Sequence, residues 1–218
     1  MQKLTQFNST EKEILTELFA SYPNMDVKWI TTLIENYIYE YATDVIQNIY
    51  KVQSRLRYGC LDGPTIVYWQ DGTIMKKMSF IQDVCHGDLL VYHQNGRLSK
   101  QIQYHFGKMH HSYKEWNIFG ILVLECSYNL GTLDGYYCRS SNSGIPLLEC
   151  TYVNGLLHGN FRKNYTNGQV HIKTMYVCGN IEGEYYEWNC SGERIANKRY
   201  LRGKEVNKFR YLLQTKIL

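Results

Sequence analysis

The chain has little proline and no long apolar run. Three prolines among 218 residues leave almost all of the backbone amides able to donate hydrogen bonds. No stretch of about 18 apolar residues occurs, so we expect no membrane-spanning helix. The polar start MQKLTQFNSTEKE lacks the apolar segment of a secretory signal peptide. Together these absences predict an intracellular protein.

The cysteines lack the pairing typical of a secreted or metal-binding domain. There are seven, an odd number, and none forms a Cys-x-x-Cys pair. This usage predicts reduced thiols inside a cell. Cys126 and Cys150 stand in the same column of the repeat described below, which favours a packing position for both. A disulfide between these two residues is the alternative.

The sequence also lacks the motifs of common enzymes and cofactor-binding folds. We find no Gly-x-Ser-x-Gly, His-Glu-x-x-His, P-loop or dinucleotide-binding pattern. His110 and His111 are adjacent, but no third ligand is placed beside them by the repeat. A net charge of +4 is too small to indicate nucleic-acid binding by itself. We therefore expect no catalytic residue, cofactor or metal site, no enzyme activity and no nucleic-acid partner.

Glycine is abundant and strictly periodic. All 17 glycines fall into three columns of a ladder with a period of 24 residues. A fixed period of this size predicts a repeat architecture. His111 stands in the place of a sixth glycine in the first column, and Asp83 replaces one in the third. The first column is Gly63, Gly87, Gly135, Gly159 and Gly183; the second is Gly72, Gly96, Gly120, Gly144, Gly168 and Gly192; the third is Gly59, Gly107, Gly131, Gly155, Gly179 and Gly203.

In each of the six copies, the residue pattern predicts a strand, a turn, a second strand and a second turn. In the second strand apolar and polar residues alternate, as expected for a half-buried β-strand. Each second strand ends on one aromatic side chain. These form an aromatic column that we expect to stack along one face of a sheet. The copies begin at Gly63, Gly87, His111, Gly135, Gly159 and Gly183, and the aromatic column is Phe80, Tyr104, Tyr128, Tyr152, Tyr176 and Tyr200.

The turns set the topology. Asp71-Gly72 and Asn95-Gly96 lie between β-type runs, and such pairs favour tight hairpins because glycine accepts positive φ. The second connection, such as 154–159, is also short and predicts a tight loop with a bulge. Both are too short for a parallel crossover, so all neighbouring strands should be antiparallel. We expect a mainly β protein with a small α-helical part, an elongated single-sheet antiparallel meander.

The ends of the chain differ from the array. Thr10 to Glu13 has the form of a capping box, and a second helix is expected from Asp26. Its apolar stripe continues through Val45, Ile46 and Ile49 to about residue 51, either as one helix or as two. We therefore assign residues 1–58 to two or three helices that form a cap or a docking module. The six repeats occupy 59–206, and 207–218 is a partial terminal repeat.

The pattern Gly-x4-Tyr/Trp-x3-Gly-x7-Tyr-x2-Gly-x3-Gly resembles the MORN repeat. It is most similar to the variant form found in bacterial antitoxin-like proteins and in giant viruses of amoebae. The copy at His111 departs most, since it lacks the opening glycine. The resemblance implies a β-meander without catalysis, used in protein contact, self-association or membrane attachment, in a virion or host cytoplasm if the source is viral. The run ITTLIENYIYEY also resembles F-box-like segments.

These features favour a scaffold or adaptor that binds another protein, including a second copy of itself. The partial terminal repeat has an apolar character that suits a homodimer interface. Attachment to an anionic membrane through the basic cluster 198–210 is one alternative. An F-box-like adaptor or an antitoxin-like inhibitor is another. The candidate interface residues are Phe209, Tyr211, Leu212 and Leu213.

Overall fold

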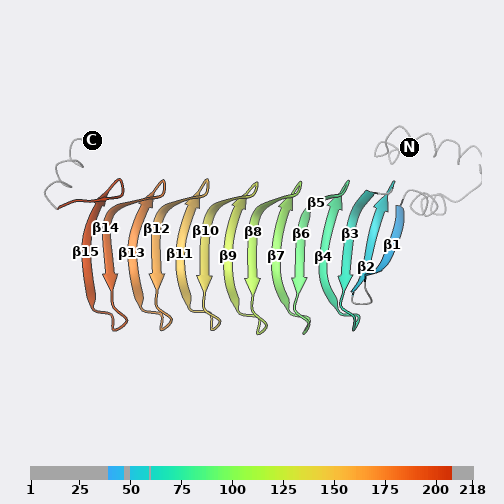
Figure 1. Cartoon of the computed structure of the whole chain (residues 1–218), viewed down its shortest axis with the longest axis horizontal. Helices are drawn as coiled ribbons and strands as arrows, with labels where there is room; N and C mark the ends of the chain where they lie inside the picture. The colour runs from blue at the N-terminus through green and yellow to red at the C-terminus, as the bar shows by residue number, and fades with distance from the viewer. Residues whose placement is uncertain (1–38, 47–49, 59, 208–218) are drawn as a thin grey trace, which may run out of the picture.

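The described part of the chain is one antiparallel sheet. The computed structural model describes residues 39–46, 50–58 and 60–207, with side chains from Val52 onward. The strands follow one another in chain order from β1 to β16, and only β5 lies off this path, where it pairs with β4. Figure 1 shows the strands side by side in a single row. The strands are β1 (Tyr39–Ile46), β2 (Tyr50–Arg57), β3 (Cys60–Tyr68), β4 (Ile74–Ile81), β5 (Val84–Cys85), β6 (Gly87–Tyr92), β7 (Leu98–His105), β8 (Lys108–Trp116), β9 (Leu122–Asn129), β10 (Thr132–Ser140), β11 (Pro146–Val153), β12 (Leu156–Asn164), β13 (Val170–Val177), β14 (Asn180–Trp188), β15 (Arg194–Leu201) and β16 (Lys204–Glu205).

Each residue of the aromatic column lies directly opposite a first-column position on the neighbouring strand. In every copy the first-column position is the direct register partner of the aromatic residue, as Gly159 is of Tyr176. A glycine opposite a ring leaves room for the ring to lie flat over the backbone. The single-sheet antiparallel meander predicted from the sequence is thus confirmed. The other pairs are Gly63–Phe80, Gly87–Tyr104, His111–Tyr128, Gly135–Tyr152 and Gly183–Tyr200.

The turns follow the glycine ladder. All six second-column glycines have φ between 80° and 86°, as expected from Asp-Gly and Asn-Gly hairpins. At the other end of the strands, two consecutive residues have positive φ, for example Leu130 at 47° and Gly131 at 93°. This is the two-residue type I′ turn, whose twist matches that of the flanking strands. Asp83 and His111, the two substitutes for glycine, both keep φ at 64°.

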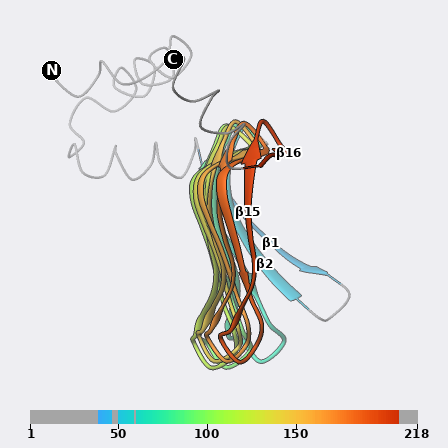
Figure 2. The same ribbon diagram turned by 90° about the vertical axis from the view of Figure 1, so that its left-hand side faces the viewer.

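The sheet has no second layer among the described residues, so its core is formed by one of its own faces. We call this the ring face, because it carries the aromatic column; Leu89, Ile102, Cys126 and Cys150 are buried on it. Leu89 and Ile102 are register partners, and aromatic rings on adjacent strands lie beside Ile102, Cys126 and Cys150. We call the opposite face the reverse face. Figure 2 shows most of the strands in projection as one thin, curved layer, from which β1 and β2 splay away.

The helices expected between residues 39 and 51 were a wrong prediction. Residues 39–46 and 50–57 form the antiparallel pair β1 and β2, with Tyr39 opposite Arg57 and Ile46 opposite Tyr50. The apolar spacing fitted a helix, but β-branched and aromatic residues also recur at every second position from Tyr39 to Val45. A strand here satisfies the open edge of β3, which a helix cannot do. The helices expected in 1–38 lie outside the described residues, as does the partial repeat from residue 208.

β2 takes the place of the second strand of a further copy of the repeat, although β1 pairs with it one residue out of the register of the other copies, with Tyr39 opposite Arg57 rather than Leu56. Ser54 on β2 pairs with Thr65, just as Ile102 pairs with Tyr113 in the middle of the array. Gly59 already occupies the third column of the glycine ladder. The first two columns of this copy hold Tyr39 and Asn48 in place of glycine, so the ladder did not reveal it.

Candidate functional site

The ring face carries a regular row of paired aromatic rings. In four successive copies, a ring from the first strand meets the aromatic-column ring of the second strand. Three of the pairs meet edge to face, an arrangement that aromatic quadrupoles favour. In these four copies the aromatic-column rings thus lie on one face of the sheet. The pairs, with their centroid distances, are Tyr113–Tyr128 at 6.1 Å, Tyr137–Tyr152 at 5.8 Å, Phe161–Tyr176 at 5.3 Å and Tyr185–Tyr200 at 5.8 Å.

A small polar cluster interrupts the ring face. Lys100 Nζ lies 2.5 Å from Glu115 Oε1 and 3.3 Å from the Tyr113 hydroxyl, which also donates to Glu115. Burial raises the pKa of Tyr113 to about 12, aided by the hydrogen bond to Glu115. Although burial opposes it, hydrogen bonds from Lys100 and Tyr113 lower the pKa of Glu115. All three groups satisfy one another, so this cluster joins β7 to β8 and has no group left over for chemistry.

Neighbouring copies are linked along the edge that carries the type I′ turns. In five of the six copies, the residue just before the first-column position accepts a hydrogen bond from the backbone amide of the next such turn. His110 Nδ1 accepts from Leu130 N at 3.3 Å, and Asp134 Oδ2 accepts from Asn154 N at 3.4 Å. Imidazole and carboxylate thus have the same acceptor role. The others are Phe106 N to His86 Nδ1 at 3.4 Å, Cys178 N to His158 Nδ1 at 3.4 Å, and Arg202 N to Glu182 Oε2 at 2.7 Å.

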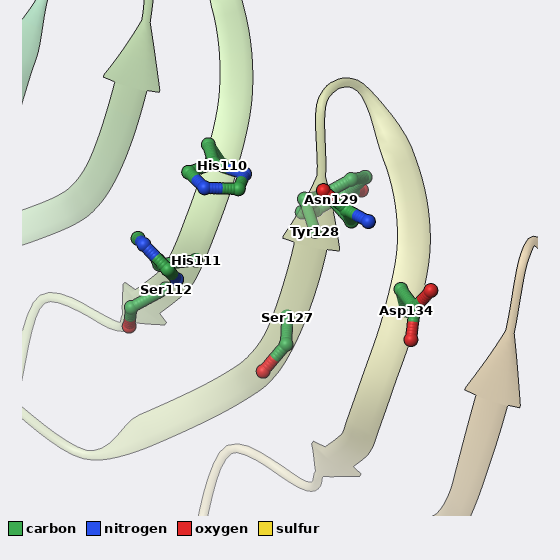
Figure 3. A pocket seen from close by; sticks show the side chains of 7 residues that line it. All are labelled: His110, His111, Ser112, Ser127, Tyr128, Asn129 and Asp134. Carbon is green, nitrogen blue, oxygen red and sulfur yellow. The ribbon is translucent and has the colours of Figure 1, made fainter.

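The copy that begins at His111 contains an open hollow of about 440 Å³ on the reverse face. Figure 3 shows its lining: three residues from the start of β8, three from the end of β9, and Asp134 from β10. Two serines, Ser112 and Ser127, are register partners here, and their small side chains leave the space. Larger residues fill the same two positions in most copies. The lining is His110, His111, Ser112, Ser127, Tyr128, Asn129 and Asp134.

The electrostatics of the hollow favour a neutral imidazole. Desolvation, and then the neighbouring His111 and His105, lower the pKa of His110. Its ring centroid lies 4.0 Å from that of His111. Because His110 Nδ1 accepts a backbone hydrogen bond, its proton belongs on Nε2. Asp134 is the one acidic side chain of the lining.

No arrangement typical of a catalytic or metal centre is found among the described residues of the hollow. Within the described strands, neither Ser112 nor Ser127 has a hydrogen bond to a histidine, so no activated hydroxyl is present. No group of three or more histidine, cysteine or acidic side chains in the described ranges has the geometry to hold a metal ion. The hollow is open to solvent rather than enclosed.

A second feature of the reverse face was not found from the sequence. Five large apolar side chains over β10 to β13 are each at least 40% exposed. We call them the reverse-face patch. They escaped notice because they belong to several different columns of the repeat, and only the register of the sheet brings them together. They are Tyr136 (43% exposed), Val153 (44%), Leu156 (51%), Met175 (42%) and Val177 (40%).

The glycines singled out in the sequence act in the backbone rather than at a binding site. All those in the first and second columns have positive φ, and a side chain at several of them would touch the neighbouring copy. Cys126 and Cys150 are buried, and all seven cysteines are free, so the alternative of a disulfide between these two is wrong. Phe209, Tyr211, Leu212 and Leu213 lie outside the described residues.

Comparison with known families agrees with the repeat assignment. Residues 157–177, which run from the start of β12 to the end of β13, match the family model described as the MORN repeat variant. The MORN-type resemblance is therefore supported for this copy of the repeat. No curated protein matches the chain. No match supports the F-box-like resemblance.

Proposed function

We propose that this protein is a non-enzymatic scaffold that binds other proteins through the faces of its sheet. The observation that supports the proposal is the small number of buried side chains. Among the described residues only four apolar and four polar side chains are buried. A single layer of this kind presents a large surface from few residues.

Protein partners are favoured over a membrane by the state of the basic residues. Of the cluster 198–210, Lys198 Nζ lies 3.2 Å from Glu205, and the Arg199 guanidinium pairs with Glu184. Paired cations contribute little to attraction by an anionic surface. No helix among the described residues is long and apolar enough to cross a membrane. The apolar side chains exposed on the reverse face suit a protein surface.

We further propose that the protein acts inside the cell and associates with a second copy through its C-terminal end. The free thiols fit a reducing compartment. β16 covers only two residues of β15, so most of the outer edge of β15 has no partner strand within 39–207. Edges of this kind pair with other chains. An adaptor role in a larger assembly would use the same surfaces.

The test is affinity purification with the full chain as bait, from the cell that produces it, followed by reconstitution with each retained protein. We expect at least one protein to bind the purified chain with a Kd of about 1 µM or tighter, as specific scaffolds do. Binding to anionic vesicles with no reconstituted protein partner would overturn the proposal in favour of membrane attachment.

A further inference from the structure

We propose that the reverse-face patch is a docking site for an amphipathic helix of a partner protein, with basic residues at both ends of its apolar stripe. This rests on the scaffold function proposed above and names the partner chemistry. The patch consists of Tyr136, Val153, Leu156, Met175 and Val177. Nothing in the repeat itself requires these exposed side chains to be apolar, since other copies carry Asn129, Thr132 or Lys108 at corresponding positions.

The five side chains form one continuous surface. Val153 and Leu156 are register partners across the β11–β12 hairpin. A Cβ on Gly179, in the next hairpin, would lie 3.6 Å from Leu156 Cδ2, so Leu156 touches the turn that directly follows Val177. Met175 lies two residues before Val177 on the same face of β13. Tyr136 pairs with Thr151, which lies two residues before Val153 on the same face of β11.

The spacing between successive copies of the sheet is close to the rise of one heptad of an α-helix. Successive copies are two strands apart, which is about 9.6 Å. Seven residues of α-helix rise about 10.5 Å, so a helix lying across the strands meets equivalent positions of successive copies once per heptad. Val153 and Val177 are such equivalent positions, as are Asp134 and Glu182 two copies apart. A helix of roughly 13 residues spans the roughly 19 Å between the last pair.

The charges around the patch define the partner and argue against a second copy of this chain. Asp134 lies at one end and Glu182, the register partner of Met175, at the other. The middle of the sheet adds Arg162 and Lys173, of which Arg162 lies 4.0 Å from Glu149. Two copies packed about a two-fold axis would set Asp134 against the partner's Glu182, and like charges repel. A helix with basic ends, and with acidic residues on the flank toward Arg162 and Lys173, is complementary.

The experiment measures binding of a designed 14-residue helix to the full chain by fluorescence anisotropy. The labelled peptide has leucines at the first and fourth position of each heptad, lysines at both ends and glutamates on one flank. Leu156→Thr and Val177→Thr should each weaken binding about tenfold, because each removes apolar area from the contact. The matched controls are Val84→Thr and Ile81→Thr, the same two positions of an earlier copy, which should leave the affinity unchanged. All four residues are exposed or nearly so on the surface, and equal melting temperatures verify the fold.

Several outcomes would overturn the proposal. If the patch and control substitutions weaken binding of the peptide equally, the peptide binds elsewhere. A peptide with glutamates at both ends should bind about fivefold more weakly, since each exposed ion pair contributes little; equal binding would contradict the charge assignment. Tighter binding of a synthetic peptide of residues 208–218 would identify the chain itself as the occupant. If the full chain forms dimers and Leu156→Thr abolishes them, the occupant of the patch is a second copy of the chain. If reconstituted natural partners bind Leu156→Thr normally, this site is wrong while the scaffold function stands.

Discussion

Gly159 and Thr151 approach each other so closely that no side chain fits between their strands. A Cβ added to Gly159 would lie 2.8 Å from Thr151 Oγ1, and Gly159 has φ at 87°. The Thr151 hydroxyl donates to the carbonyl of His158 in the same region. The glycine is thus required twice, once by its backbone conformation and once by its neighbour. At Gly87, the same position of another copy, φ is 84° but nothing lies within 4 Å.

This comparison separates strain from crowding. Gly87→Ala should lower the free energy of unfolding by about 1 kcal/mol, from left-handed strain alone. Gly159→Ala should cost about 2–3 kcal/mol, because contact with Thr151 adds to that strain. In a Thr151→Ala background, the cost of Gly159→Ala should fall toward that of Gly87→Ala. Urea denaturation of the four variants measures this, and equal costs in both backgrounds would contradict the contact.

At His111 we expect the opposite effect, a substitution by glycine that stabilises the protein. It adopts φ at 64° where other copies have glycine. Relief of the strain, reduced by the greater chain entropy of glycine, should make His111→Gly about 0.5–1 kcal/mol more stable. The reverse change, Gly135→His, should destabilise, since a Cβ there lies 3.1 Å from Ser127 Cβ. A melting temperature lowered by His111→Gly would show that the imidazole makes contacts worth more than its strain.

The array could be predicted from the sequence because one residue type marks its turns. Gly72 and Gly168 lie in the expected hairpins with φ at 84° and 86°. The β1–β2 hairpin could not, since Tyr39 and Asn48 take the glycine positions and the Tyr39–Ile46 stripe fits both a helix and a strand. The open edge of β3 decides between the two, and an edge is a tertiary property that local spacing does not contain.

The surface features were harder to predict than the fold. The aromatic column was visible because Tyr128 and Tyr152 recur at the repeat period. The hollow and the reverse-face patch depend on departures from that period, such as Ser112 opposite Ser127. Val153 and Leu156 are close only because a two-residue turn pairs them. The surfaces proposed for binding thus lie where the copies differ, and they can be recognised only once the register is known.

Acid should weaken the contacts between copies that use imidazole acceptors. A protonated His110 Nδ1 cannot accept from Leu130 N, and the pKa of His110 is lowered in the folded protein. The unfolded chain therefore binds this proton more readily than the folded one. The associated stability is present above the ordinary histidine pKa of about 6.5 and is lost as pH falls through the lowered value.

His110→Asp tests this directly. Asp134 has the same acceptor role in the next copy, and a carboxylate stays ionised at pH 5.5. Between pH 7.5 and 5.5 the free energy of unfolding should fall less for His110→Asp than for the unchanged chain. An identical pH dependence would contradict the role assigned to His110 Nδ1. His171→Asn is the control, because its imidazole belongs to a different strand contact, beside Glu187.

The seven thiols should react at rates that follow burial. Cys178 and Cys190 are exposed, whereas Cys126 and Cys150 are buried. Burial raises the pKa of Cys126 to about 11 and raises that of Cys150, so little thiolate is present at neutral pH. Alkylation followed by mass spectrometry should label the first pair within minutes and the second pair only after unfolding. Early labelling of Cys126 would show that the rings do not cover the ring face.

The final prediction concerns self-association at the C-terminal end. β16 holds only two residues of β15, and the sequence that follows Asn207 contains Phe209, Leu212 and Leu213. An unpaired edge next to apolar residues is stabilised by a second copy across a two-fold axis. Light scattering on the full chain at about 50 µM should therefore give the mass of a dimer, since weak edge contacts have Kd values of micromolar order.

Two changes locate that contact. A chain ending at Gly203 loses β16 and the terminal segment, and it should be monomeric. Leu212→Asp with Leu213→Asp keeps β16, so it should also give monomers while the melting temperature stays close to that of the unchanged chain. A monomeric full chain at this concentration would exclude the dimer. Dimers that persist in both variants would locate the contact elsewhere, and Leu156→Thr would then decide whether it is the reverse-face patch, because that substitution leaves the C-terminal end untouched.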